Sequence, residues 1–357
     1  MIPIFDLKRQ YGEIKEEIDS AISRVMESGF FILGEEVRKF EEEFAKYIGT
    51  KYCIGVANGT DALTISLKAR GIGNGDEVIT VANTASPTVM AILNVGAKPV
   101  LVDCNDFYNI DVDQIEEKIT DKTKAILPVH LYGQPADMNG VKKISEKNQF
   151  HIIEDVCQAH GSDFDGKKTG SFGDGCFSFY PTKNLGCYGD GGAITTNDKE
   201  FAEKCRMLRF YGQKETAYNS LIKGYNSRLD ELQAAILREK LKHLDEWNKK
   251  RKTIVKLYNE LLKKAEVPKV KENANHVFHL YVVRSGKRDA LREFLKSQGI
   301  GTSIHYPFPI HHQKAFGIKE SFPKTEQNSK EIISLPIYPE LTEEEVMEVS
   351  NAVNSFG

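Results

Sequence analysis

Short apolar runs alternate with longer amphipathic stretches through the first half of the chain. Capping residues mark the ends of the helices between these runs: Thr60 and Asp61 lie at the start of one amphipathic stretch, and Gly71 lies at its end. Strands that alternate with helices are typical of a largely parallel sheet covered by helices. We therefore predict an α/β sandwich with strands at residues 52–56, 77–81, 99–102, 125–129, 151–153, 175–179 and 192–196.

The second half of the chain has a different pattern of apolar and polar residues. Residues 200–211 and 230–264 repeat their apolar positions with a period near 3.6, which predicts two helices. The second is long enough to connect two lobes. After Pro268 the chain reads as a smaller α+β unit with a proline-rich loop at 306–309. We predict a large α/β domain over residues 1–238 and a small α+β domain over residues 239–357.

Length and composition agree with a two-lobed globular protein. The chain has 357 residues, 40% hydrophobic and 28% charged, and one core usually stops growing before that length. No segment reaches the roughly 18 uninterrupted apolar residues of a membrane helix. The first residues also lack the apolar centre of a signal peptide. We expect a cytoplasmic protein that does not enter a membrane.

Charge and cysteine usage exclude two further classes of protein. The formal net charge is -3, so there is no basic surplus to neutralise a nucleic-acid backbone. The six cysteines form no CxxC pair and no His-rich cluster, which argues against a disulfide framework and a zinc site. We expect a reducing compartment, no nucleic-acid partner and no metal.

The most informative stretch is CFSFYPTKNLGCYGDGGAITT at residues 176–196. A predicted strand leads to Lys183, which lies in a glycine-rich loop, and glycine lets the backbone approach a ligand closely. A lysine among apolar and glycine neighbours can lose its proton and attack a carbonyl group as an amine. Most lysines are solvated surface groups, but these neighbours favour a Schiff base on Lys183.

Two carboxylates follow the apolar run at 151–153. Glu154 and Asp155 fall at the C-terminal end of a predicted strand, where α/β sheets bind ligands. Pyridoxal phosphate (PLP) forms Schiff bases with lysine and acts as an electron sink when an anion supports its ring nitrogen. We assign Asp155 to that anion, because strand alternation turns Glu154 away. An ordinary helix cap is the alternative. Gln158 could donate to the ring oxygen.

A third motif, GVANGTDALTISL, is a strand followed by Gly59 and Thr60 at a helix start. Free backbone N–H groups and the helix dipole stabilise a phosphate at such a position. Ser178 could add a hydroxyl to the same phosphate. The glycine turn alone does not distinguish a phosphate site from ordinary turn geometry.

In this order, the motifs resemble those of the DegT/DnrJ/EryC1/StrS family of sugar aminotransferases. The resemblance implies a fold-type I PLP aminotransferase, with a three-layer α/β/α large domain and a smaller α+β C-terminal domain. It spans nearly the whole chain and rests on nine segments: GFFILGEEVRKFEEEFAKYIG, ANGTDAL, GDEVI, GAKPVLVD, PVHLYGQPADM, IIEDVCQAHG, SFYPTKNLGCYGDGG, GYNSRLDELQAA and IHYPFPIHHQKAF.

The resemblance also implies a role for each cofactor residue. Lys183 would carry PLP as a Schiff base and serve as the catalytic residue, Asp155 would pair with the ring nitrogen, and Gln158 would contact the ring oxygen. Asn226 would reach the phosphate of the neighbouring subunit, because family members are homodimers that share their active sites. The contacts to the subunit's own phosphate would come from Gly59, Thr60 and Ser178.

The implied substrates are a nucleotide-linked keto sugar and glutamate as amino donor. A sugar diphosphate needs cationic or backbone donors, and we expect it near Arg228, His305, Tyr306 and His312. Ordinary structural roles for these histidines remain an alternative. The KNLG and GDGG segments look more like members that aminate C-3′, which favours a dTDP-3-keto-6-deoxyhexose.

The chain departs from the family pattern at one position, and two alternative functions stay open. Many members carry an aromatic residue that stacks on the cofactor where this chain has Ala85, so that contact is in doubt. Amination at C-4′ and a regulatory protein that binds PLP without turnover both stay open. The family's dehydratases replace the Schiff-base lysine with histidine, so Lys183 argues against dehydration.

Overall fold

The computed structural model describes residues 1–214 and 218–356. Its centre is a seven-stranded sheet with the order β1-β9-β8-β5-β4-β2-β3. All seven predicted strands are present, three of them with the predicted bounds. The strands are β1 (Tyr52–Val56), β2 (Glu77–Val81), β3 (Lys98–Val102), β4 (Thr123–Leu127), β5 (His151–Asp155), β8 (Asp174–Ser178) and β9 (Gly192–Thr196).

The sheet is parallel except at one strand. β2, β3, β4, β5 and β8 pair in parallel, whereas β9 pairs antiparallel with both β8 and β1. Strand β9 therefore runs against the other six strands. The prediction of a largely parallel sheet is confirmed, and the C-terminal ends of those six strands lie at one edge.

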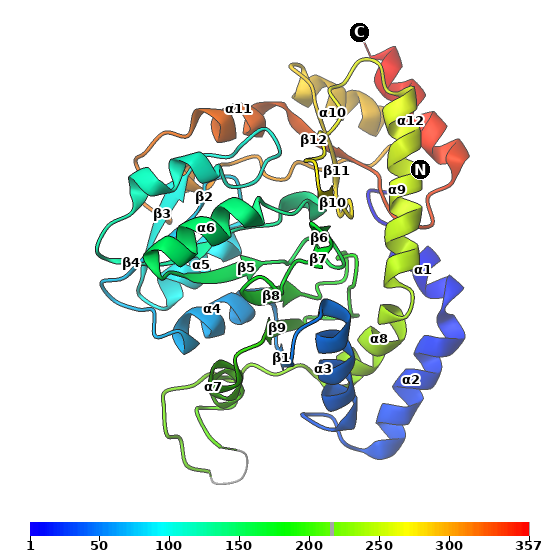
Figure 1. The fold of residues 1–357 in the computed structure, drawn as a ribbon. Coiled ribbons are helices and arrows are strands. Elements are labelled where there is room, and N and C mark those ends of the chain that lie inside the picture. Colours follow the sequence, from blue (N-terminus) through cyan, green and yellow to red (C-terminus); the bar gives the residue numbers. More distant parts are fainter. Residues whose placement is uncertain (215–217, 357) are drawn as a thin grey trace.

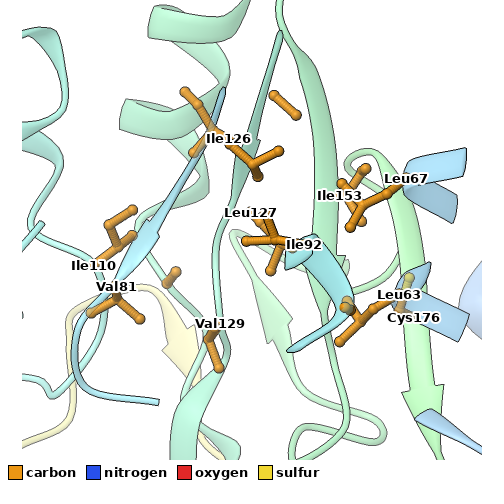
Figure 2. Packing of buried hydrophobic residues seen from close by; sticks show 14 of the residues in the cluster. Leu63, Leu67, Val81, Ile92, Ile110, Ile126, Leu127, Val129, Ile153 and Cys176 are labelled. Atoms are coloured by element: carbon orange, nitrogen blue, oxygen red, sulfur yellow. The ribbon is translucent and has the colours of Figure 1, made fainter. Parts of the chain in front are cut away.

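Helices cover both faces of the sheet (Figure 1). On one face, Leu63 and Leu67 of α4 and Ile92 of α5 pack with strand residues such as Ile153 (Figure 2). On the other face, α3 and α8 form a second core with Phe177 and the end of β8. The large-lobe helices are α3 (Glu35–Ile48), α4 (Gly59–Ala69), α5 (Ser86–Asn94), α6 (Met138–Asn148), α7 (Lys199–Arg209) and α8 (Glu231–Leu241).

A smaller lobe packs at the end of a long helix, α9 (Figure 1). Its core joins the second half of α9 to a two-stranded antiparallel sheet of β11 and β12. A further three-stranded sheet has the order β10-β6-β7. The remaining elements are α1 (Leu7–Glu13), α2 (Lys15–Ser28), β6 (Asp163–Phe164), β7 (Lys167–Lys168), α9 (Leu244–Leu261), β10 (Ala274–Asn275), β11 (Tyr281–Arg284), α10 (Arg288–Ser297), α11 (Pro323–Glu331), β12 (Ile332–Leu335) and α12 (Glu343–Ser355).

The single helix predicted over residues 230–264 is wrong in one respect. The structure breaks it at Lys242 and His243 into α8 and α9, although neither residue is a helix breaker. Packing explains the break, since α8 belongs to the core of the large lobe and α9 continues into the small lobe.

The predicted domain boundary after residue 238 falls inside α8. Leu244 still packs in the large-lobe core, whereas Ile254 packs in the small-lobe core. The change of core therefore occurs along α9. Among the described helices, none combines the length and apolar character needed to cross a membrane.

Candidate active site

The predicted site residues come together at the C-terminal edge of the sheet. Asp155 ends β5 and Ser178 ends β8, its parallel neighbour. In the register, Val56 lies opposite Gly192, which in turn lies opposite Ser178. The turn that leads from β1 into α4 therefore faces the end of β8. Ligands of α/β sheets bind at this edge.

Lys183 lies in a closed loop that follows β8. Its backbone N–H donates to the Tyr180 carbonyl at 2.8 Å, and the Cys187 N–H donates to the Phe179 carbonyl at 2.8 Å. The Asn184 amide anchors the loop further, because its Nδ2 donates to Asn248 Oδ1 at 2.8 Å and to the Val277 carbonyl at 3.0 Å. The loop thus holds the lysine backbone from both sides.

The environment of the Lys183 side chain favours its neutral form. Burial lowers the pKa of the Lys183 ammonium below its ordinary value, although Cys157 and Asp155 partly oppose the shift. Burial and the Lys183 charge together lower the pKa of His160 to about 3. The same two causes lower the pKa of His279 well below its ordinary value. A lysine that deprotonates readily can act as a nucleophile.

Asp155 is a fixed, buried carboxylate with 6% exposure. The Thr88 hydroxyl donates to its Oδ2 at 2.8 Å, and the Cys157 N–H donates to its Oδ1 at 3.2 Å. These two donors hold the carboxylate in one orientation. The carboxylate can therefore serve as a preorganised anion for a cationic ligand group.

Glu154 points to the opposite face, as strand alternation predicts. Its carboxylate lies 3.1 Å from His130 Nε2 and is fully buried. It also accepts three backbone N–H groups, from Gly170, Phe172 and Gly173. Glu154 therefore supports the structure and takes no part in the site.

Gln158 is held by both ends of its amide. Its Oε1 accepts the Tyr132 N–H at 2.8 Å, and its Nε2 donates to the Tyr306 hydroxyl at 2.9 Å. Burial raises the pKa of Tyr306 to about 12, so its hydroxyl keeps its proton at neutral pH. Gln158 and Tyr306 thus form one polar unit near Asp155.

Gly59 starts α4 at a place where no side chain fits. A Cβ there would lie 2.7 Å from Ser178 Cβ and 2.8 Å from Cys157 Sγ. The preceding residue, Asn58, caps the helix and accepts the Asp61 N–H at 2.8 Å. Gly59, Thr60 and Ser178 therefore line one small cradle at a helix N-terminus, where an anion is stabilised.

Asn226 and Arg228 flank Ser227, whose hydroxyl accepts the Ala57 N–H at 3.0 Å, two residues before Gly59. Asn226 is exposed and forms a bridge with Phe210. The Arg228 guanidinium lies 5.5 Å from the ring centroids of both Phe210 and Tyr211. No contact between either residue and Lys183 or Asp155 is found among the described residues of this chain.

The two predicted histidines have different surroundings. His305 Nδ1 lies 2.8 Å from the Ser334 hydroxyl, and burial lowers the pKa of His305 to about 4. His305 is therefore neutral and cannot supply positive charge. The His312 side chain is 50% exposed and lies 4.0 Å from Glu326 near the start of α11. The structure thus groups His312 with Glu326 rather than with Lys183.

Sequence patterns missed several residues of the site. Thr88, His160 and His279 gave no signal, because each is an isolated polar residue in its own segment. Thr88 is 67 positions from the carboxylate to which it donates. Only the parallel pairing of the strands brings α5 to the end of β5.

Comparisons with known proteins identify relatives over nearly the whole chain. The family model described as "DegT/DnrJ/EryC1/StrS aminotransferase family" matches residues 12–354. A relative from Aneurinibacillus thermoaerophilus, "dTDP-3-amino-3,6-dideoxy-alpha-D-galactopyranose transaminase", is 52% identical over 100% of both chains. A "Pleiotropic regulatory protein" from Geobacillus stearothermophilus is 47% identical and covers 99% of this chain and 98% of its own.

A solved structure shares the whole fold. The crystal structure of S. venezuelae DesV in complex with a ketimine intermediate is 43% identical, with a TM-score of 0.96. The alignment covers 99% of this chain and 97% of that chain. The predicted α/β architecture with its smaller second lobe is confirmed. The chain therefore belongs to the DegT/DnrJ/EryC1/StrS aminotransferase family.

Proposed function

We propose that this protein is a PLP-dependent aminotransferase that transfers an amino group from glutamate to C-3′ of a dTDP-linked 3-keto-6-deoxyhexose. One observation carries the proposal: a buried lysine with a lowered pKa, Lys183, lies near the fixed carboxylate of Asp155. Membership of an aminotransferase family supports the reaction type.

The residues present fit the cofactor. Asp155 offers a buried anion for the ring nitrogen, and Gln158 Nε2 offers a donor for the ring oxygen. Gly59 lets the start of α4 pack closely against Ser178, so the cradle of Gly59, Thr60 and Ser178 offers a helix N-terminus and hydroxyl groups for the phosphate. When bound there, PLP supplies an electron sink for the carbanion that transamination requires.

Each residue then has a defined task. With the cofactor bound, Lys183 would be the neutral amine that bonds to its carbonyl carbon and gives way to the donor amine. The freed Lys183 amine would then hold and move the proton between the α-carbon of the donor and the cofactor. Asp155 would keep the ring nitrogen protonated. Transfer from glutamate and transfer to the keto sugar would alternate, which predicts ping-pong kinetics.

The choice of sugar rests on the relatives and on the loop after Lys183. The Aneurinibacillus relative is named for a dTDP-3-amino-3,6-dideoxy sugar, and it is 52% identical over its whole length. The KNLG and GDGG segments point to the same carbon. We therefore expect C-3′ and dTDP rather than C-4′ or another nucleotide.

A substrate panel tests this proposal. Purified protein is incubated with PLP, glutamate and a set of 3-keto and 4-keto nucleotide sugars, and NMR locates the new amine. We expect amination at C-3′ of a dTDP sugar. Amination at C-4′ alone would overturn the regiochemistry, and the absence of any amination would overturn the reaction.

The name of the Geobacillus relative favours one second candidate, a regulator that binds PLP without turnover. Lys183, Asp155 and Gln158 retain the groups that turnover needs, which supports the enzyme. Glutamate distinguishes the two functions. Glutamate alone should convert the bound cofactor to its amine form in the enzyme, whereas a pure sensor leaves the absorption spectrum unchanged.

We propose a cytoplasmic setting on the basis of the thiols. All six cysteines are free, and five of them are buried. Free cysteines are the normal state in the reducing cytoplasm.

We further propose a homodimer whose active sites each use both subunits. Among the described residues of one chain, Asn226 and Arg228 make no contact with Lys183 or Asp155, and the Gly59 cradle and a sugar diphosphate both need further donors. Large exposed side chains support an interface: Tyr180 is 53% exposed, Leu221 56% and Phe308 68%.

Complementation between inactive subunits tests the shared site. Lys183→Ala and Arg228→Ala chains are each expected to lose most activity, but a mixed dimer contains one site with both intact residues. Co-expression should therefore restore about a quarter of wild-type activity, as measured by amino-sugar formation. A mixture that stays as inactive as its components would show that each chain builds its site alone.

Gly59→Ala is expected to weaken cofactor binding at least tenfold. The added Cβ would press against Ser178 and Cys157 and close the cradle intended for the phosphate. Titration of apoprotein with PLP, followed by absorbance, measures the affinity. Gly286→Ala is the control, because its added Cβ would meet no atom within 4 Å and its backbone is not left-handed. Equal effects of both changes would contradict the phosphate assignment.

A further inference from the structure

A buried lysine lies behind the loop that carries Lys183. Lys240, at the end of α8, is only 1% exposed. Its Nζ donates to the Gly186 carbonyl at 2.5 Å, and this is its one hydrogen bond among the described residues. The Nζ also lies 4.8 Å from the ring centroid of Tyr188 and 5.9 Å from that of Trp247.

The position of this cation is energetically unfavourable without a specific contact. Burial lowers the pKa of Lys240 to about 8, against the opposing influence of Cys187 and Glu340. At neutral pH the ammonium is therefore still charged and is satisfied by one carbonyl and two aromatic faces. An apolar side chain would fill the same space without the desolvation cost. An apolar residue could reproduce neither the two aromatic contacts nor the bond to Gly186, and the bond to Gly186 is the hydrogen bond that ties Lys240 to the loop of Lys183.

Gly186 lies directly against the residues that precede Lys183. A Cβ on Gly186 would lie 2.4 Å from the Pro181 carbonyl oxygen and 2.7 Å from the Tyr180 carbonyl oxygen. The same Tyr180 carbonyl accepts the Lys183 N–H at 2.8 Å. A cation that holds the Gly186 carbonyl therefore holds both ends of the turn on which Lys183 lies.

We propose that Lys240 is a positioning residue for Lys183: its ammonium fixes the Gly186 carbonyl and so orients the lysine amine toward the reacting carbon. This inference rests on the assignment of Lys183 in the proposed function. Lys240 touches neither substrate nor cofactor and acts only through the loop.

Two substitutions and one control test the role of Lys240. Lys240→Met keeps most of the unbranched side chain but removes its donor, and Lys240→Gln has the same reach as Met and keeps a neutral donor. Arg70→Met is the control, because Arg70 pairs with Asp174 at the start of β8, the opposite end of the strand that leads to Lys183. It should destabilise the fold without touching the loop.

The holoenzymes are compared by three measurements: thermal midpoint, the pH midpoint of the visible band of lysine-bound cofactor, and the single-turnover rate with glutamate. We expect Lys240→Met to slow single turnover about tenfold or more and to move the pH midpoint by about 0.5 unit or more, because the loop no longer holds the Lys183 amine in one position. Lys240→Gln should slow it about threefold, and Arg70→Met should lower only the thermal midpoint.

If the Met variant keeps the wild-type rate and pH midpoint, Lys240 has only a structural role and the proposal is overturned. If the Met variant does not fold, the Gln variant decides, and a wild-type rate and pH midpoint in the Gln variant would also overturn the proposal. A wild-type protein without the visible band would instead contradict the assignment of Lys183. The two failures are thus distinguishable.

Discussion

Lys183→Ala is expected to abolish turnover and to remove the visible absorption band of the lysine-bound cofactor. The reason is chemical, since no other described amine lies in the loop between β8 and β9. The Lys183 amine is expected to serve both as nucleophile and as proton carrier, so a single substitution removes both contributions to the rate. The rate should fall by at least about four orders of magnitude. Stopped-flow absorbance and amino-sugar formation measure the two effects.

Lys183→Arg is the matched control for charge. A guanidinium keeps the positive charge near Asp155, but it stays protonated and cannot attack a carbonyl group. The Arg variant should therefore be as inactive as the Ala variant. Turnover by either variant would refute the assignment of Lys183 as the residue that bonds to the cofactor.

The second large effect is expected at Asp155. Asp155→Asn keeps the shape of the side chain and the contact with Thr88, but it removes the anion that is proposed to support a protonated ring nitrogen. Loss of one partner of a buried ion pair costs about 3 kcal/mol or more, which corresponds to at least roughly a hundredfold in rate. The kcat should fall while the lysine-bound form still assembles, which spectroscopy and steady-state kinetics separate.

Thr88→Val provides a graded comparison with Asp155→Asn. It removes only the hydroxyl that donates to Asp155 Oδ2 at 2.8 Å. We expect a fall in kcat of about tenfold, because the carboxylate keeps its charge and its Cys157 N–H donor. If Asp155→Asn retains the wild-type kcat, the carboxylate is structural and the ring-nitrogen role is wrong.

The local pattern of apolar and polar residues was sufficient to predict the strands of the large lobe. The apolar runs coincide with the strands because each run is buried and bounded by turn or capping residues. The local pattern could not predict the register of the strands or the direction in which each one runs. Whether β9 runs parallel or antiparallel to β8 depends on how the loop around Lys183 returns, and no residue in that segment encodes it alone.

The same contrast holds for the helix predicted over residues 230–264. Its period near 3.6 continues through Lys242 and His243, so propensity alone predicts one helix. The structure ends α8 there because two different cores hold the two halves. Tertiary packing overrides propensity when each half buries its own apolar face.

The sequence by itself determined the α/β layering, and it predicted which residues have cofactor chemistry: Lys183, Asp155, Gln158 and the Gly59 turn. These are visible because strand ends, glycine turns and carboxylates leave local signatures. Only the tertiary structure decided that His305 is neutral, that Thr88 orients Asp155 and that Lys240 holds the loop of Lys183. Burial and hydrogen bonding between segments far apart along the chain set these properties, and neither is a property of any single segment.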